Sequence, residues 1–443
     1  MIHAARENPT PAANRSPTEK QAPSMDAFLI RGGRRLDGSI RVGGAKNAAL
    51  PLMAAALAAP GEHVLENFPS LMDTRTMARV LETLGARVRV EDHVCRIDTR
   101  GVDSVEAPYE LVKTMRASFY VLGPLLARFG EARVSLPGGC AWGPRPVDLH
   151  VKAMERLGAD VAVEHGYIVA RAPHGLTGCH FLFDLVSVGA TGNLLMAAAL
   201  ARGETVIENA ALEPDITQLA EYLFQMGADI TGIGTSRLTV RGVRALTPGR
   251  ARIIPDRIEA ATYLAAGAVA GGPLTVTGMD AAHCGAVLRT LADAGVEARA
   301  VGADTVVVDR SRRPHAVDVT TAPYPGFPTD MQAQIMALLA LADGASVVTD
   351  TVYHDRFTHV PELARLGADI RLEGNVAVVK GVEKLSGCPV MATDIRAGAG
   401  IVLAALAAEG ETRVSRVYHL DRGYEQLDEK LAAAGADIRR VRG

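Results

Sequence analysis

The chain has 443 residues, of which 48% are hydrophobic and 22% charged, a composition typical of a globular protein with more than one hydrophobic core. Its 47 basic and 50 acidic residues leave a formal net charge of −3 at pH 7, which argues against a broad surface for nucleic acid or membrane. The five cysteines form no CxxC pair and have no metal-ligand spacing with histidine, so the sequence predicts a cytoplasmic protein without structural disulfides, metal or cofactor.

The N-terminal segment 1–24 is rich in Pro, Asn and Ala and lacks the apolar stretch of a signal peptide. We expect it to be a disordered tail. Apolar runs such as 48–60 stop at about a dozen residues, too short to cross a bilayer.

The rest of the chain repeats one unit of about seventy residues six times. A glycine closes an apolar helical stretch in every unit, and successive glycines are 73, 69, 68, 72 and 68 residues apart. A second glycine series runs in register with the first, so the period is a property of the whole chain. The first series is Gly85, Gly158, Gly227, Gly295, Gly367 and Gly435, and the second is Gly61, Gly130, Gly203, Gly271, Gly344 and Gly410.

Each unit predicts the same order of elements. An Ala/Leu-rich helix ends at a glycine of the second series. A β-branched run such as 205–208 follows, then a loop, an amphipathic helix and one or two alternating strands such as 161–163. The Ala-rich helices are expected in the middle of each lobe, at 48–59, 117–129, 190–202, 258–270, 331–343 and 397–409.

Strands joined through helices indicate an α/β fold. Six units exceed one core, so two lobes of three repeats are the simplest division, with the break near 249–255.

Functional residues recur where the first helix of each unit begins. Lys46 lies 15 residues before its marker glycine, and Arg116, Gly189, Arg257, Asp330 and Arg396 each lie 14 before theirs. A lone Ser or Asp at this position is usually only an N-cap, but a cation there opposes the helix dipole. The pattern therefore favours an anion pocket shared by the two lobes, for a ligand with phosphate and carboxylate groups.

A glycine- and proline-rich loop at 136–148 surrounds Cys140, with Arg145 five residues further on. Most lone cysteines are inert core residues, which is our expectation for the other four. A neighbouring arginine and helix start would lower the pKa of a thiol, so Cys140 is a candidate proton donor or nucleophile.

Together these motifs resemble the enolpyruvyl transferases, specifically the UDP-N-acetylglucosamine 1-carboxyvinyltransferase family. The resemblance runs from about residue 25 to 442. It rests on the motifs at 44–47, 113–118, 138–140, 145–150, 327–332, 392–396 and 421–425.

The resemblance implies two inside-out α/β barrels of three repeats each, one formed by 46–254 and the other by 25–45 with 255–443. It implies transfer of the enolpyruvyl group of phosphoenolpyruvate to the 3-hydroxyl of UDP-N-acetylglucosamine, by addition and elimination, with release of phosphate. The expected partners are these two small molecules, with no nucleic acid, membrane or obligate protein partner.

It also implies roles for individual residues. Cys140 is the expected acid and Asp330 the expected base. Lys46, Arg145 and Arg422 are expected to hold phosphate and carboxylate. Among the acceptor contacts, Asn47 is expected at the sugar. The implied substrate-binding residues are Asn47, Arg116, Arg145, Pro146, Val147, Asp148, Leu149, Ser187, Val188, Gly189, Val352, Arg356, Asp394 and Arg396; 145–149 are expected at the uracil and 187–189 at the diphosphate.

Three positions depart from the family pattern. Leu185 stands where many members have a lysine, Trp142 replaces a smaller aliphatic residue, and Asp215 replaces a common glutamate. These changes leave open another uridine nucleotide as acceptor, such as the 3′-hydroxyl of UMP. A binding protein without turnover is a third interpretation, which the presence of both Cys140 and Asp330 disfavours.

Overall fold

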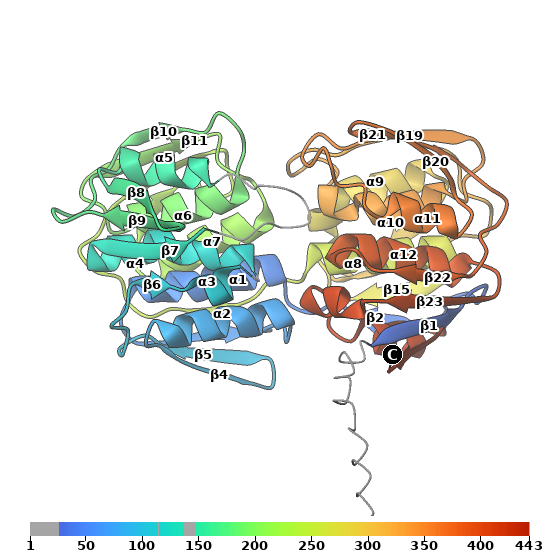
Figure 1. The fold of residues 1–443 in the computed structure, drawn as a ribbon, viewed down its shortest axis with the longest axis horizontal. Coiled ribbons are helices and arrows are strands. Elements are labelled where there is room, and N and C mark those ends of the chain that lie inside the picture. Colours follow the sequence, from blue (N-terminus) through green and yellow to red (C-terminus); the bar gives the residue numbers. More distant parts are fainter. Residues whose placement is uncertain (1–25, 114, 137–146, 443) are drawn as a thin grey trace, which may run out of the picture.

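The structure is a computed structural model that describes residues 26–113, 115–136 and 147–442. The predicted tail and the candidate residues Cys140, Arg145 and Pro146 therefore lie outside the described residues, as does Trp142. Two lobes lie side by side (Figure 1). In the described ranges, no helix has both the length and the apolar character needed to cross a membrane.

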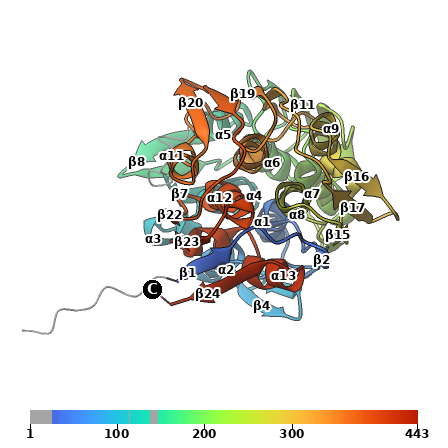
Figure 2. The same ribbon diagram turned by 90° about the vertical axis from the view of Figure 1, so that its right-hand side faces the viewer.

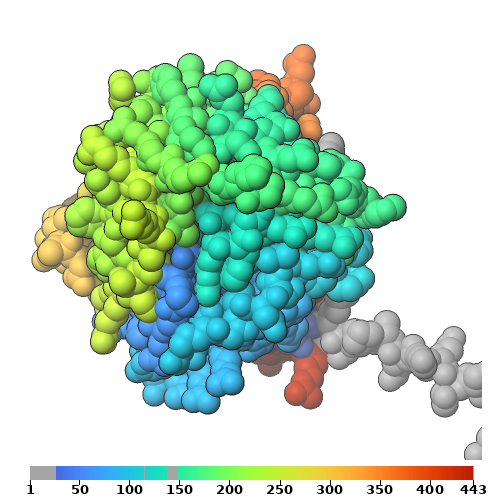
Figure 3. Space-filling model, turned by 90° about the vertical axis from the view of Figure 1, so that its left-hand side faces the viewer, coloured from blue at the N-terminus to red at the C-terminus, as the bar shows by residue number. Residues whose placement is uncertain are grey.

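The first lobe surrounds a hydrophobic core built from residues between Ala45 and Ile253. Figure 3 shows its outer face, on which three successive stretches of the chain form neighbouring bands. Its elements are α1 (Lys46–Ala55), η1 (Ala56–Ala58), β3 (Glu62–Glu66), α2 (Met72–Thr83), β4 (Arg87–Glu91), β5 (Val94–Asp98), β6 (Glu106–Ala107), α3 (Tyr109–Val112), η2 (Arg116–Val121), α4 (Leu122–Phe129), β7 (Glu131–Ser135), α5 (Asp148–Arg156), β8 (Asp160–Glu164), β9 (Tyr167–Arg171), β10 (His180–Leu182), α6 (Val188–Ala198), β11 (Glu204–Glu208), α7 (Pro214–Gln225), β12 (Asp229–Thr231), β13 (Arg237–Arg241) and β14 (Arg250–Arg252).

The second lobe surrounds a separate core, which combines Phe28 to Val42 with residues between Ile258 and Ile438. Its elements are β1 (Ala27–Arg31), β2 (Ser39–Arg41), α8 (Arg257–Ala270), β15 (Leu274–Thr277), η3 (Ala281–Cys284), α9 (Gly285–Asp293), β16 (Glu297–Ala300), β17 (Thr305–Asp309), β18 (Val319–Thr320), η4 (Thr329–Met331), α10 (Gln332–Leu339), β19 (Ala345–Thr349), α11 (Val360–Arg365), β20 (Asp369–Glu373), β21 (Val376–Lys380), β22 (Pro389–Met391), α12 (Ile395–Ala407), β23 (Glu411–Ser415), η5 (Val417–Arg422), α13 (Leu427–Ala433) and β24 (Asp437–Val441).

Within the residues that the structure describes, the strands form six sheets of four, all with the same order of parallel and antiparallel pairing. In the order β6-β7-β9-β8, the outer strand β6 runs parallel to β7, while β9 pairs antiparallel with both β7 and β8. The predicted six α/β repeats are thus confirmed. The other sheets are β14-β3-β5-β4, β10-β11-β13-β12, β2-β15-β17-β16, β18-β19-β21-β20 and β22-β23-β1-β24.

Helices occupy the interior of the lobes and sheets lie outside, as the Ala-rich pattern predicts. In the second lobe α8, α10 and α12 pack against one another, surrounded by the sheets (Figure 2). Small residues permit the close approach, because a Cβ at Gly400 of α12 would lie 2.6 Å from the backbone oxygen of Ala333 in α10. Helices buried on all sides form the centre of an inside-out barrel.

Several central helices are shorter than predicted. The expected helix 331–343 begins as η4, and its α-helical part ends at Leu339. Beyond it the backbone tightens into i→i+3 bonds, from Leu341 to Leu338 and from Ala342 to Leu339. Such 3₁₀ turns satisfy the last carbonyls of a helix before its stop glycine.

Over residues 26–113, 115–136 and 147–442 the chain crosses between the lobes twice, and the two crossings pair with each other. Gly44 and Pro255 form an antiparallel bridge. The N–H of Ala45 donates to the oxygen of Ile254 over 2.8 Å, and that of Asp256 donates to the oxygen of Gly43 over 3.0 Å. This paired linker leads directly into α1 and α8, which begin at Lys46 and Arg257.

Candidate active site

A buried carboxylate joins two of the predicted cations across the lobes. Lys46 is the first residue of α1, and its Nζ lies 3.1 Å from Oδ2 of Asp73 on α2. The other oxygen of Asp73 accepts from Nε of Arg422, at the end of η5 in the second lobe, over 2.8 Å. The side chain of Asp73 is only 6% exposed. Burial raises the pKa of Asp73, but the charges of Lys46 and Arg422 outweigh burial and lower it, so the carboxylate is ionised.

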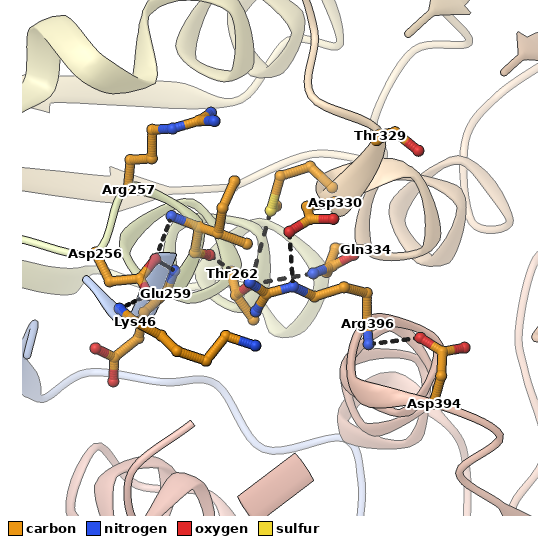
Figure 4. Close-up of polar contacts among 12 residues, drawn as sticks. Lys46, Asp256, Arg257, Glu259, Thr262, Thr329, Asp330, Gln334, Asp394 and Arg396 are labelled. Atoms are coloured by element: carbon orange, nitrogen blue, oxygen red, sulfur yellow. Dashed lines mark hydrogen bonds and ion pairs between the residues drawn. The ribbon is translucent and has the colours of Figure 1, made fainter. Parts of the chain in front are cut away.

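Asp330 in η4 is held between two arginines of the second lobe. Nη1 of Arg356 lies 2.7 Å from one carboxylate oxygen. Nε of Arg396 lies 3.1 Å from the other oxygen (Figure 4). Burial raises the pKa of Asp330, but the charges of Arg356, Arg396 and Lys46 hold it well below its usual range. Asp330 is therefore a carboxylate at every physiological pH.

The ion pairs around Asp73 and those around Asp330 face each other, and together they contain more positive than negative charges. The ammonium group of Lys46 points toward the guanidinium of Arg396 (Figure 4). Nη1 of Arg396 is buried and lacks a hydrogen-bond partner among the residues that the structure describes. Lys46, Arg356, Arg396 and Arg422 carry four positive charges against two on Asp73 and Asp330, a surplus that suits a multiply charged anion.

The loop after β19 carries Val352 and Arg356 and is organised by Asp350, which is fully buried. Asp350 accepts from the hydroxyl of Thr329 over 2.7 Å and from the backbone N–H groups of Val352 and Tyr353. The Tyr353 hydroxyl in turn lies 3.1 Å from Nη1 of Arg116, in the first lobe. Tyr353, the neighbour of Val352, thus lies at the junction of the lobes.

The residues predicted for the acceptor nucleotide lie on two neighbouring helix starts of the first lobe. Ser187 caps α6, accepting from the N–H of Ala190 over 3.3 Å. His150 on α5 lies against the start of α6, because a Cβ at Gly189 would be 3.1 Å from its ring. The first turn of α5, which follows Val147, thus lies near the start of α6, which follows Ser187.

Two other candidates, Asn47 and Asp394, and the unusual position Leu185 are described by their exposure or by hydrogen bonds to the backbone. Asn47 is exposed beside Lys46. Asp394 caps α12, with Oδ1 accepting from the N–H groups of Arg396 and Ala397. Leu185 is 73% exposed, so its side chain lies at the surface and takes no part in the hydrophobic core.

The start of α7, with its N-cap Glu213 and with Asp215 in its first turn, faces Arg257 across the lobe junction. Oδ2 of Asp215 is 3.9 Å from Nε of Arg257. Burial raises the pKa of Asp215 to about 6, the charge of Arg257 opposes this rise, and Asp256 and Glu213 add to it.

This raised pKa predicts that Asp215 destabilises the protein at neutral pH. The folded protein binds more protons than the unfolded chain between the ordinary pKa of 3.8 and about 6, so stability falls over this range as pH rises. We expect Asp215→Asn to raise the free energy of unfolding at pH 7.5 by about 1–3 kcal/mol, with the gain vanishing near pH 4. Urea unfolding at both pH values measures this, with the exposed Asp160→Asn as control. A gain independent of pH would contradict the assignment.

Comparisons with known proteins agree with this geometry. The EPSP synthase (3-phosphoshikimate 1-carboxyvinyltransferase) family profile matches residues 30–431. The chain is 54% identical over 417 residues to a UDP-N-acetylglucosamine 1-carboxyvinyltransferase of Trichlorobacter lovleyi, covering 94% of this chain and 99% of the relative. It is 55% identical over 423 residues to the enzyme of that name from an Anaeromyxobacter species, covering 95% of this chain and the whole relative.

Solved structures of enolpyruvyl transferases have the same fold. The enolpyruvyl transferase NikO of Streptomyces tendae superposes with a TM-score of 0.86 at 30% identity, covering 95% of this chain and all of NikO. An EPSP synthase of Acinetobacter baumannii has a TM-score of 0.72 at 16% identity, over 95% of this chain and all of that one, and shares the fold. The chain belongs to the UDP-N-acetylglucosamine 1-carboxyvinyltransferase family of enolpyruvyl transferases.

Proposed function

We propose that this protein transfers the enolpyruvyl group of phosphoenolpyruvate to the 3-hydroxyl of UDP-N-acetylglucosamine in the cytoplasm, releasing phosphate. The main support from the geometry is the surplus of positive charge around Lys46 and Arg396, next to the ionised Asp330. Phosphoenolpyruvate carries a phosphate and a carboxylate, the two groups that arginine and lysine bind best.

The low pKa of Asp330 restricts when it accepts a proton. A carboxylate between two arginines is too weak a base to ionise a free hydroxyl. The hydroxyl becomes acidic only as its oxygen bonds to the enolpyruvyl carbon while the neighbouring carbon is protonated. Asp330 therefore takes the proton during bond formation, and Cys140 is the proposed donor to the carbon.

The cations stabilise the charge of the tetrahedral intermediate and of the leaving phosphate. Lys46 and Arg422 share Asp73, so both point into one space although their backbones belong to different lobes. A fixed donor aimed at developing anionic charge contributes on the order of 3–4 kcal/mol. Contacts across the lobes, including Arg116 to Tyr353 and Ser70 to Glu425, would help exclude water from the intermediate.

Phosphate release tests the proposal. Phosphoenolpyruvate is supplied with UDP-N-acetylglucosamine, with UMP or alone, and phosphate is measured over time. We expect turnover with the UDP-sugar and little with UMP. Nucleotide binding without phosphate release would contradict an enzymatic role.

The second candidate acceptor is another uridine nucleotide. The exposed Leu185, two residues before Ser187, favours it because a cationic contact to a diphosphate is absent at this position. Faster release with UMP than with UDP-N-acetylglucosamine would support this alternative.

Cys140→Ser is expected to keep nucleotide affinity and to lose most turnover, because a hydroxyl is a far weaker acid than a thiol. Alkylation provides a second measurement. Burial raises the pKa of both Cys95 and Cys284 to about 12, so these thiols should react slowly. Selective labelling of Cys140 that changes with added nucleotide is expected. Full activity of Cys140→Ser would contradict its role.

A further inference from the structure

A second cavity lies in the second lobe, on the far side of Arg257 from the reaction centre. It has a volume of about 80 Å³ and is bounded by the first turn of α8, by η3 with the start of α9, and by the loop from Tyr324 to Pro328. One water needs about 10–15 Å³ of such space, so the cavity has room for several waters or one small oxyanion. The guanidinium of Arg257 points away from Lys46, Asp330 and Arg396 (Figure 4).

Two arginines border this cavity. The Arg257 guanidinium lies 5.4 Å from the centre of the Tyr324 ring, and its buried Nε has no hydrogen-bond partner within the described ranges. Its nearest ion-pair contact, Asp215, is at 3.9 Å, beyond hydrogen-bond distance. Arg289 folds back over the start of α9, so that a Cβ at Gly285 would be 3.5 Å from its Nη1. The helices α8 and α9 thus each place a positively charged side chain at the cavity.

His283 adds a third polar group. Its Nε2 is 3.6 Å from Oδ2 of Asp280, whereas its buried Nδ1 has no partner among the described residues. Burial lowers the pKa of His283, with Asp280 opposing and Arg257 reinforcing this shift, so the ring is neutral at pH 7. A proton on Nε2 faces the Asp280 carboxylate, which leaves Nδ1 as a hydrogen-bond acceptor.

We propose that this cavity binds a hydrogen phosphate group, free or as a phosphate monoester, separately from the reaction centre. Its unprotonated oxygens accept from Arg257 and Arg289, and its P–OH donates to Nδ1 of His283. The unprotonated sulfate ion has the same size but lacks this donor. Because Arg257 also faces Asp215 in the first lobe, the bound group competes with Asp215 for Arg257 and alters the contact between the lobes.

Calorimetric titration with inorganic phosphate tests the site. Lys46→Gln serves as the background, because it weakens phosphate binding at the reaction centre. We expect one saturable phosphate site in this background, weakened on the order of tenfold by adding Arg289→Gln, equivalent to about 1.4 kcal/mol. Adding Arg299→Gln, an exposed arginine of β16 in the same repeat, is the matched control and should leave binding unchanged.

Arg289 is exposed, so its substitution should not unfold the chain, which circular dichroism checks. Sulfate is expected to bind at least several-fold more weakly than phosphate. Equal phosphate affinity with and without Arg289→Gln, or no saturable site in the Lys46→Gln background, would overturn the site. Equal affinity for sulfate and phosphate would overturn the assignment to a protonated oxyanion.

Discussion

Asp330→Asn is expected to slow phosphate release from phosphoenolpyruvate and UDP-N-acetylglucosamine by a factor on the order of 10²–10⁴. Asparagine keeps the shape of the side chain but cannot accept the proton of the hydroxyl. It also leaves Arg356 and Arg396 without their shared counter-charge, so affinity for the anionic nucleotide should be retained or increased. Asp330→Ala should lose turnover at least as completely.

Two further measurements separate a chemical role of Asp330 from a structural one. Because the surrounding charges hold its pKa well below the usual range, the loss should be the same at pH 6 and pH 8. Asp293→Asn, at the exposed end of α9, is the control and should be fully active. Unchanged turnover in Asp330→Asn, or a parallel loss of nucleotide binding, would refute the proposed role.

The second large effect is expected at Asp73. Replacing it by asparagine leaves the buried Lys46 and the partly buried Arg422 without a carboxylate and removes an ion pair between the lobes. We expect the free energy of unfolding to fall by about 3–5 kcal/mol, the cost of breaking a buried ion pair. Misplacement of both cations should lower kcat/KM for phosphoenolpyruvate on the order of 10²-fold. Urea unfolding and steady-state kinetics measure these effects.

A double-mutant cycle tests whether Asp73 acts through Arg422. If it does, the losses in Asp73→Asn and Arg422→Gln should not add, with a coupling of about 0.5–3 kcal/mol. Arg413→Gln, on the exposed face of β23, should be additive with Asp73→Asn. Strict additivity with Arg422→Gln would show that Asp73 does not position this cation.

Much of the fold can be predicted from the sequence because glycines recur with the period of the structural repeat. A glycine at φ +100° ends α2 at Gly85, and Gly158, Gly227, Gly367 and Gly435 end equivalent helices at positive φ. These positions favour glycine, so the repeat persists while other residues change. The topology of the sheets is harder to predict from the sequence, since the outer strands β2 and β14 pair with segments far along the chain.

The charged cluster can be predicted in part for a related reason. Cations at helix starts stand out in a sequence because the helix dipole disfavours them, and Lys46 and Arg396 are two of them. Asp73 was missed because a carboxylate in the first turn of α2 is ordinary on its own. Only the approach of Arg422, 349 positions away, gives it a further role. Asp350 offered a weak signal, an aspartate two residues before Val352 that forms a side-chain turn.

The pairing of β1 with β23 and β24 has a consequence for biosynthesis. The ribosome makes residue 27 early, yet β24 ends at residue 441, and at ordinary elongation rates this separation takes roughly 20–80 s. For most of this time, until β23 is made at residues 411–415, β1 with its apolar Phe28, Leu29 and Ile30 has neither of its neighbours. Meanwhile the sheets built from residues 62–252 can form without it. The nascent chain therefore exposes an unpaired apolar strand until translation is nearly finished. We expect chaperones to bind the nascent chain at this strand.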